Sequence, residues 1–138
     1  MTDAQITIRQ LDHLVLTVAD LDRTIQFYQQ VLGMQVIVFG EGRFALQFGD
    51  QKINLHHVER TFEPKAGKPT PGSADLCFWV ETPLAVAALH LQQHGITPEA
   101  GPVPRTGARG PIQSLYLRDP DGNLIELANY ADSAPTAH

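Results

Sequence analysis

The pattern of apolar and polar residues predicts a strand followed by an amphipathic helix near the start of the chain. Residues 11–18 alternate or run apolar, as a partly buried strand does. The next apolar positions recur at helical spacing and form one face: Leu21, Ile25, Tyr28 and Leu32. Asp20 is a good N-cap before this face, and Gly33 is a natural residue to end the helix.

The same order of signals returns in the second half of the chain. Residues 74–80 read as a strand, and a second apolar helical face follows it: Leu84, Ala87, Ala88 and Leu91. Thr82 is the expected N-cap, with Pro83 at the first helical position. Gly95 is placed to end this helix.

A constant offset relates the two halves and indicates an internal repeat. His13 and Asp75 are 62 positions apart, and the same offset separates the glycines that end the two helices. Short strands are expected after each helix, at 34–39, 43–48, 52–58, 97–101, 112–118 and 123–129. Asn54 and Glu126 are 72 positions apart, so ten extra residues fall in the second half, where we expect a Pro- and Gly-rich loop at 102–111.

These elements predict an α+β fold built from two βαβββ modules. The modules comprise residues 8–58 and 73–130, and a loop-like linker at 59–72 joins them. Neither half is large enough to be expected to be stable alone. We therefore expect a single domain, residues 8–130, in which a curved mixed sheet surrounds a cleft.

Four polar residues fall at matched strand positions of the repeat: His13, Asn54, Asp75 and Glu126. If the modules pair about a pseudo-two-fold axis, these side chains face a common centre. One imidazole, one amide and two carboxylates are costly to bury without compensation, and a divalent cation would compensate them. A metal-free polar cluster is the alternative interpretation.

The amino-acid composition limits the kinds of partner and the cellular location that we expect for this protein. Ten Lys and Arg against 15 Asp and Glu give a net charge of −5, which argues against a nucleic-acid-binding protein. The single cysteine, Cys77, cannot form an intrachain disulfide and lies in an apolar run, where a core side chain is expected. No apolar run is long enough to span a membrane and the N-terminal residues lack a signal sequence, so we expect a cytoplasmic protein.

Three stretches resemble the vicinal oxygen chelate superfamily: LDHLVLTVADLDRTIQFYQQVLGM, SADLCFWVETPLAVAALHLQQHGI and LRDPDGNLIELANY. That superfamily includes glyoxalase I, methylmalonyl-CoA epimerase, extradiol dioxygenases, and fosfomycin-resistance and bleomycin-binding proteins. The resemblance covers about residues 8–130 and implies a glyoxalase-like fold. The stretches FGDQKINLHH and FEPKAGKPTPGSADLC look closer still to its glyoxalase-domain-containing, virulence-associated branch.

The resemblance implies that His13, Asn54, Asp75 and Glu126 bind a divalent metal ion. Asn54 stands where glyoxalase I has Glu or Gln, and Asp75 stands where the superfamily usually has His. The exchange of His for Asp gives a harder, oxygen-rich site that would accept Mn²⁺, Mg²⁺, Fe²⁺, Ni²⁺ or Zn²⁺. Glu126 is also implied as a catalytic base. His56 shares a strand face with Asn54 and is a second candidate base or ligand, unless it lies near solvent at the strand end.

The function implied is a metal-dependent lyase, isomerase or hydrolase that acts on a small oxygenated metabolite. Arg105 and Arg109 of the expected loop would bind a carboxylate or phosphate of this substrate, unless they are solvated surface side chains. An extradiol-type dioxygenase and a metal-free drug-binding protein are the alternatives, although Asp75 departs from the two-His, one-carboxylate set that such dioxygenases use. Relatives commonly form homodimers, and the residues leave open whether one chain or two complete the site.

Overall fold

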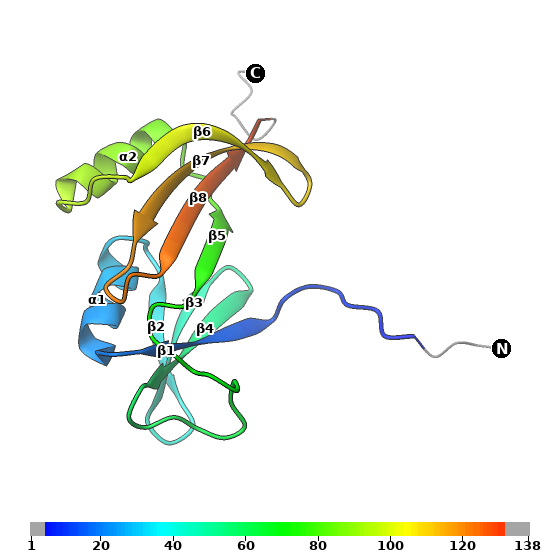
Figure 1. Ribbon diagram of the computed structural model, residues 1–138, viewed down its shortest axis with the longest axis vertical. Helices are drawn as coiled ribbons and strands as arrows, with labels where there is room; N and C mark the ends of the chain where they lie inside the picture. Colours follow the sequence, from blue (N-terminus) through cyan, green and yellow to red (C-terminus); the bar gives the residue numbers. More distant parts are fainter. Residues whose placement is uncertain (1–4, 132–138) are drawn as a thin grey trace.

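The computed structural model describes residues 5–131 and contains two four-stranded sheets, each with one helix (Figure 1). The first module consists of β1 (His13–Val18), α1 (Leu21–Gln30), β2 (Gln35–Phe39), β3 (Arg43–Phe48) and β4 (Gln51–His57). The second consists of β5 (Asp75–Trp79), α2 (Leu84–Gln93), β6 (Ala100–Gly107), β7 (Gly110–Arg118) and β8 (Leu124–Tyr130). The repeated order confirms the predicted α+β fold of two βαβββ modules.

Strand pairing is the same in both sheets. The strand orders are β1-β4-β3-β2 and β5-β8-β7-β6. Because the helix makes a crossover connection, the first and last strands of each module pair in parallel, whereas the other pairs are antiparallel. Both helices lie on the left-hand side in Figure 1, so one face of each sheet, which we call the uncovered face, has no helix over it. This topology brings side chains of β1 next to those of β4, and side chains of β5 next to those of β8.

The core lies between the sheets and their helices, and it is continuous from one module to the other. Its buried members include Leu16, Val18, Leu46, Ile53, Leu84, Leu91, Leu115, Leu117 and Ile125. Tyr28 of α1 is fully buried. Its hydroxyl donates a hydrogen bond at 2.6 Å to Oδ2 of Asp119, a residue of the turn between β7 and β8. Close by, the Ala19 N–H donates to Asp121 Oδ1 at 3.2 Å. These bonds attach the first module to the turn that leads into β8.

The two helices begin in different ways. Asp20 accepts a hydrogen bond from a first-turn N–H of α1, which confirms it as the N-cap. For α2, the prediction of Thr82 as N-cap with Pro83 at the first helical position is wrong, because Pro83 itself is the capping residue and offers no side-chain acceptor. Asn129 of β8 accepts from the Leu84 N–H at 2.9 Å instead. Both helices have ten residues, and within the described part of the chain no helix is long and apolar enough to cross a membrane.

The loop predicted at 102–111 is also wrong, because β6 and β7 form an antiparallel hairpin through most of this segment. Of the strand expected at 97–101, only residues 100 and 101 belong to β6. Its prolines are tolerated because β6 is an edge strand, with one side free of ladder hydrogen bonds. Gly101 has φ +109°, and a Cβ there would collide with the Ser114 carbonyl group, so this close approach requires glycine.

Candidate functional site

The uncovered face of the first sheet carries one pair of predicted metal ligands. The register places Asn54 beside Val15, and His13 lies on the same face because strand side chains alternate. His13 is exposed, and its Nδ1 lies 2.8 Å from Asp12 Oδ1. Asn54 is buried, and its Oδ1 has no hydrogen-bond partner within the described residues. An unpaired, buried amide oxygen is a candidate ligand for a hard cation.

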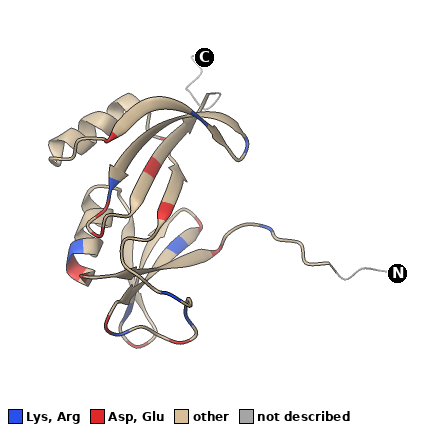
Figure 2. Ribbon diagram, in the orientation of Figure 1, with Lys and Arg blue, Asp and Glu red and all other residues tan. Residues whose placement is uncertain are grey.

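The uncovered face of the second sheet carries the other pair. Glu126 lies beside Cys77 in the β5–β8 register, which places Asp75 on the same face. The hydroxyl of the buried Ser114 donates to Glu126 Oε2 at 2.6 Å and so fixes that carboxylate. Figure 2 shows acidic positions close together on the neighbouring strands β5 and β8. Two carboxylates on one sheet face favour a bound cation.

The prediction that Cys77 is a core side chain is wrong. Alternation along β5 directs Leu76 and Phe78 toward the core, whereas Cys77 is exposed on the uncovered face. Partial burial of the sulfur, together with the nearby Glu126 carboxylate, raises the pKa of the Cys77 thiol to about 11. The thiol is therefore a neutral group beside Glu126 at neutral pH.

The structure divides the four predicted metal ligands into two pairs. His13 and Asn54 lie on the first sheet, whereas Asp75 and Glu126 lie on the second. In residues 5–131, no three or more His, Cys, Asp and Glu side chains lie close enough together to hold a metal ion. We call His13 and Asn54 the first pair and Asp75 and Glu126 the second pair, and each pair is a half-site of the predicted metal site.

His56 lies in the interior rather than near solvent, with 3% of its surface exposed. Neither ring nitrogen has a hydrogen-bond partner within the described residues. Burial lowers the pKa of His56, and the positive charges of Arg43 and Lys65 lower it further. The imidazole is therefore neutral at neutral pH, and one ring nitrogen can accept a proton.

Arg105 and Arg109 lie over aromatic rings of the second sheet. The Nε of Arg105 donates to the Tyr116 hydroxyl at 2.9 Å, and its guanidinium carbon lies 5.4 Å from the centre of that ring. The guanidinium carbon of Arg109 lies 4.8 Å from the Trp79 ring centre and 5.7 Å from that of Tyr130. The β6–β7 hairpin thus places Arg105 on β6 and Arg109 in the turn that follows it, in the module that carries Glu126.

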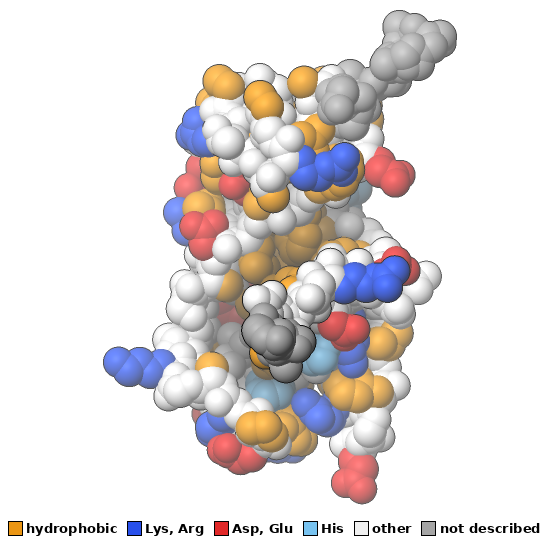
Figure 3. All heavy atoms as spheres, turned by 90° about the vertical axis from the view of Figure 1, so that its right-hand side faces the viewer, with side chains coloured by type: hydrophobic (Ala, Val, Ile, Leu, Met, Phe, Trp, Pro, Cys, Tyr) orange, Lys and Arg blue, Asp and Glu red, His pale blue; other side chains and the backbone are white. Residues whose placement is uncertain are grey.

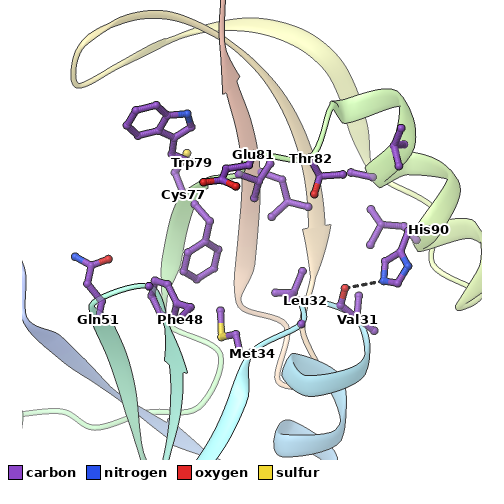
Figure 4. A pocket seen from close by; sticks show the side chains of 18 of the residues that line it. Val31, Leu32, Met34, Phe48, Gln51, Cys77, Trp79, Glu81, Thr82 and His90 are labelled. Carbon is purple, nitrogen blue, oxygen red and sulfur yellow. Dashed lines mark hydrogen bonds between the residues drawn. The ribbon is translucent and has the colours of Figure 1, made fainter. Parts of the chain in front are cut away.

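Sequence reasoning missed a pocket of about 970 Å³ at the junction of the modules (Figure 4). Phe48 and Met34 of the first module and Trp79 and Glu81 of the second are among the residues that line it. The four predicted metal ligands do not line it. Figure 3 shows hydrophobic side chains in a hollow between the upper and lower halves of the molecule. No local pattern marks a pocket of this kind, because residues distant in sequence form its walls.

Sequence reasoning also missed Arg43 of β3. Its guanidinium carbon lies 4.9 Å from the centre of the Phe39 ring and 4.5 Å from the centre of the Phe62 ring. The next residue on the same face, Ala45, lies beside Asn54 in the β3–β4 register. That strand pairing was the one available signal, because alternation then places Arg43 on the face that carries the predicted site.

Comparison with known proteins identifies the family. Residues 10–127 match the family model described as the glyoxalase/bleomycin resistance protein/dioxygenase superfamily. Glyoxalase domain-containing protein RDO1 of Mycosarcoma maydis is 59% identical over 129 residues, which cover 94% of this chain and 73% of that protein. The crystal structure of virulence protein STM3117 from Salmonella typhimurium has 56% identity and a TM-score of 0.90, and it covers 91% of this chain and 100% of that one.

A more distant relative has a named activity. Lactoylglutathione lyase of Haemophilus influenzae is 32% identical over 126 residues, which cover 86% of this chain and 90% of that enzyme. The segment matched by the family model, residues 10–127, contains all four predicted metal ligands. On the extent of these matches, the chain belongs to the glyoxalase/bleomycin resistance protein/dioxygenase superfamily.

Proposed function

We propose that this protein is a divalent-metal-dependent enzyme of lyase, isomerase or hydrolase type that acts on a small oxygenated metabolite. The observation that carries the proposal is the matched arrangement of the half-sites. Each uncovered sheet face holds two donor side chains on its parallel strand pair, at equivalent positions of the repeat. The lactoylglutathione lyases among the relatives support an enzymatic role within this superfamily.

The donor chemistry fits a divalent cation. His13 offers an imidazole nitrogen, Asn54 an amide oxygen without a partner, and Asp75 and Glu126 offer carboxylates. This oxygen-rich set suits Mn²⁺, Mg²⁺, Fe²⁺, Ni²⁺ or Zn²⁺. When bound, the ion would supply positive charge to stabilise the negative charge that develops on two neighbouring substrate oxygens.

A homodimer would combine the half-sites. The first pair of one copy would face the second pair of the other, so that each dimer holds two complete sites. The uncovered faces also expose apolar side chains, with Val15 45% and Trp79 54% accessible. An interface between the two faces would remove these side chains from water.

Side chains of this protein would carry out the proton transfer. Glu126, held by Ser114, or the neutral His56 would accept a proton from the substrate. Arg105 and Arg109, oriented by the aromatic rings beneath them, would bind a negatively charged group at the second-sheet side of the cleft. Two distinct bases, one from each sheet, would allow protons to move on both sides of a bound substrate.

Metal analysis tests the proposal. After incubation with Mn²⁺, Ni²⁺ or Zn²⁺ and dialysis, the wild-type protein should retain about one ion per chain. His13→Ala and Glu126→Ala should each abolish retention, because each removes a ligand. The matched control is His94→Ala, which removes an exposed histidine at the end of α2 and should retain the ion. A wild-type protein that retains no metal, or variants that retain as much as the wild type, would contradict the proposal.

A further inference from the structure

Arg43 is a cation held in a fixed orientation on the uncovered face of the first sheet. The rings of Phe39 and Phe62 lie within 5 Å of its guanidinium carbon, at 4.9 and 4.5 Å. Stacking on two rings restricts the guanidinium plane while leaving its N–H groups available. The Nε of Arg43 is buried and has no hydrogen-bond partner within residues 5–131. The stacking accounts for the orientation of this side chain but not for the unpaired N–H.

His56 lies directly beside Arg43. Phe44 pairs with Leu55 in the β3–β4 ladder, so the next position along places Arg43 opposite His56 on the uncovered face. The ring of Phe62 covers both residues, since its centre lies 5.3 Å from the centre of the imidazole. Both nitrogens of this buried imidazole also lack a partner within the described chain. Three unpaired ring and guanidinium nitrogens therefore gather beneath one aromatic ring.

The charge around this group is positive and uncompensated. Within the described residues, no acidic side chain forms an ion pair with Arg43. Two further cations lie nearby: Lys65, whose charge acts on His56 and which is itself paired with Glu63 at 3.5 Å, and Lys52, whose Nζ lies 3.9 Å from the centre of the Phe39 ring. Buried N–H groups and a partly buried charge without partners cost free energy, unless a ligand supplies the acceptors.

We propose that Arg43 and His56, covered by Phe62, form a pocket that binds a carboxylate group of the substrate. The guanidinium edge and one imidazole N–H match the two oxygens of a carboxylate. A phosphate dianion would need further donors, and both neighbouring lysines are engaged: Lys65 by Glu63 and Thr61, and Lys52 by the Phe39 ring, whose centre lies 3.9 Å from its Nζ. The pocket lies two residues along β4 from Asn54, or about 7 Å, which is the length of a small metabolite.

This inference rests on the proposed function in one respect, namely that the substrate occupies the cleft between the half-sites. Binding of the carboxylate itself requires no metal. It can therefore be tested on protein kept in EDTA, where a failure of metal binding has no effect on the result. Arg105 and Arg109 offer a competing anion site on the other sheet, and the experiment must separate the two.

The test is a titration followed by NMR, with lactate, its neutral amide lactamide and inorganic phosphate as probes at constant ionic strength. We expect lactate to shift the Arg43 Nε–H and His56 ring signals saturably. Lactamide should leave these signals in place, and phosphate should bind more weakly than lactate. The proposal would be overturned if lactamide binds as tightly as lactate, if phosphate binds more tightly than lactate, or if lactate causes no saturable shift.

Matched variants assign the binding to this pocket. Arg43→Gln should weaken lactate binding by about tenfold or more, because it removes the charged fork. Arg60→Gln removes an exposed arginine near the same strand end and should leave lactate affinity unchanged. Arg105→Gln reports on the competing anion site, and a loss of lactate binding in that variant with normal binding by Arg43→Gln would overturn the proposal. If Arg43→Gln does not fold, Arg43→Lys is used instead. Lysine keeps the positive charge but lacks the two parallel N–H groups of the guanidinium, so this variant should also bind lactate more weakly.

Discussion

Tyr28 shows how one side chain connects the two modules. Its buried hydroxyl donates to the Asp119 carboxylate, which also accepts from the Asn123 side chain and from two backbone N–H groups of the same turn. Burial, followed by the charge of Asp119, raises the pKa of Tyr28 above its usual value, so the hydroxyl stays protonated. This network orders the turn that leads into β8 and therefore supports the position of Glu126.

Removal of that hydroxyl should lower stability. Tyr28→Phe is expected to reduce the free energy of unfolding by about 1.5–3 kcal/mol, because a buried hydrogen bond to a charged group is lost. Urea unfolding measures this loss. Tyr116→Phe is the matched control: its hydroxyl bonds to the exposed Arg105, and we expect a change within about 0.5 kcal/mol. Equal losses in the two variants would contradict the role given to Tyr28.

The raised pKa of Cys77 predicts how its alkylation depends on pH. With EDTA present, the rate with iodoacetamide should keep rising toward about pH 11, because only the thiolate reacts. A thiol with an ordinary pKa reaches its plateau above about pH 9.5. Glu126→Gln removes a negative neighbour and should move the curve to lower pH. A plateau near pH 9 in the wild type would contradict the assigned environment.

Residue chemistry was predictable from the sequence to the extent that strand alternation shows it. Alternation places Asn54 and His56 on one face, and the register confirms this arrangement. It does not show which face a helix covers, and for that reason the apolar run around Cys77 predicts a core position that the structure contradicts. Nor does it show that the linker residue Phe62 folds back over His56 and Arg43, because that contact depends on the path of a loop.

At the scale of elements, the start of α2 depends on another strand. Asn129 of β8 accepts from the Leu84 N–H and donates to the carbonyl groups of Val80 and Thr82. The segment between β5 and α2 is thereby tied to the strand that carries Glu126. A local capping rule could not identify this contact, because 45 residues separate Leu84 from Asn129.

Asn129→Ala should therefore destabilise the protein more than the loss of the local cap of α1 does. Asp20→Ala removes one capping bond and is expected to cost about 1 kcal/mol. Asn129→Ala removes three hydrogen bonds and should cost about 2–3 kcal/mol. Denaturant unfolding of both variants under the same conditions compares them. A greater loss for Asp20→Ala would contradict the tertiary capping of α2.

The order of elements was predictable because the same strand and helix signals occur in both halves of the chain. The repeated signals predict both helices and the βαβββ order of each half, and the structure confirms them. The extent of β6 was not predictable in this way. Its prolines and glycines indicate a loop by composition, and only its position at a sheet edge makes a strand acceptable there.

For the whole molecule, the placement of the half-sites has the largest consequence. The two modules share one core, yet the first pair and the second pair of predicted ligands do not form a single cluster in the described chain. Under the proposed function, a chain that carries both pairs on uncovered faces completes a site by pairing with a second copy. The proposal of a shared site rests on this separation of the two pairs, which no single motif in the sequence shows.

Metal binding by a dimer of two different variant chains tests the proposed shared metal site most directly. His13→Ala and Glu126→Ala chains, carrying different affinity tags, are expressed together, and the heterodimer is purified through both tags. If sites form between chains, one site of the heterodimer loses both ligands and the other is intact, so about one ion per two chains should be retained, against about two for the wild type. A heterodimer without metal, beside a wild type that retains it, would contradict a site shared between copies.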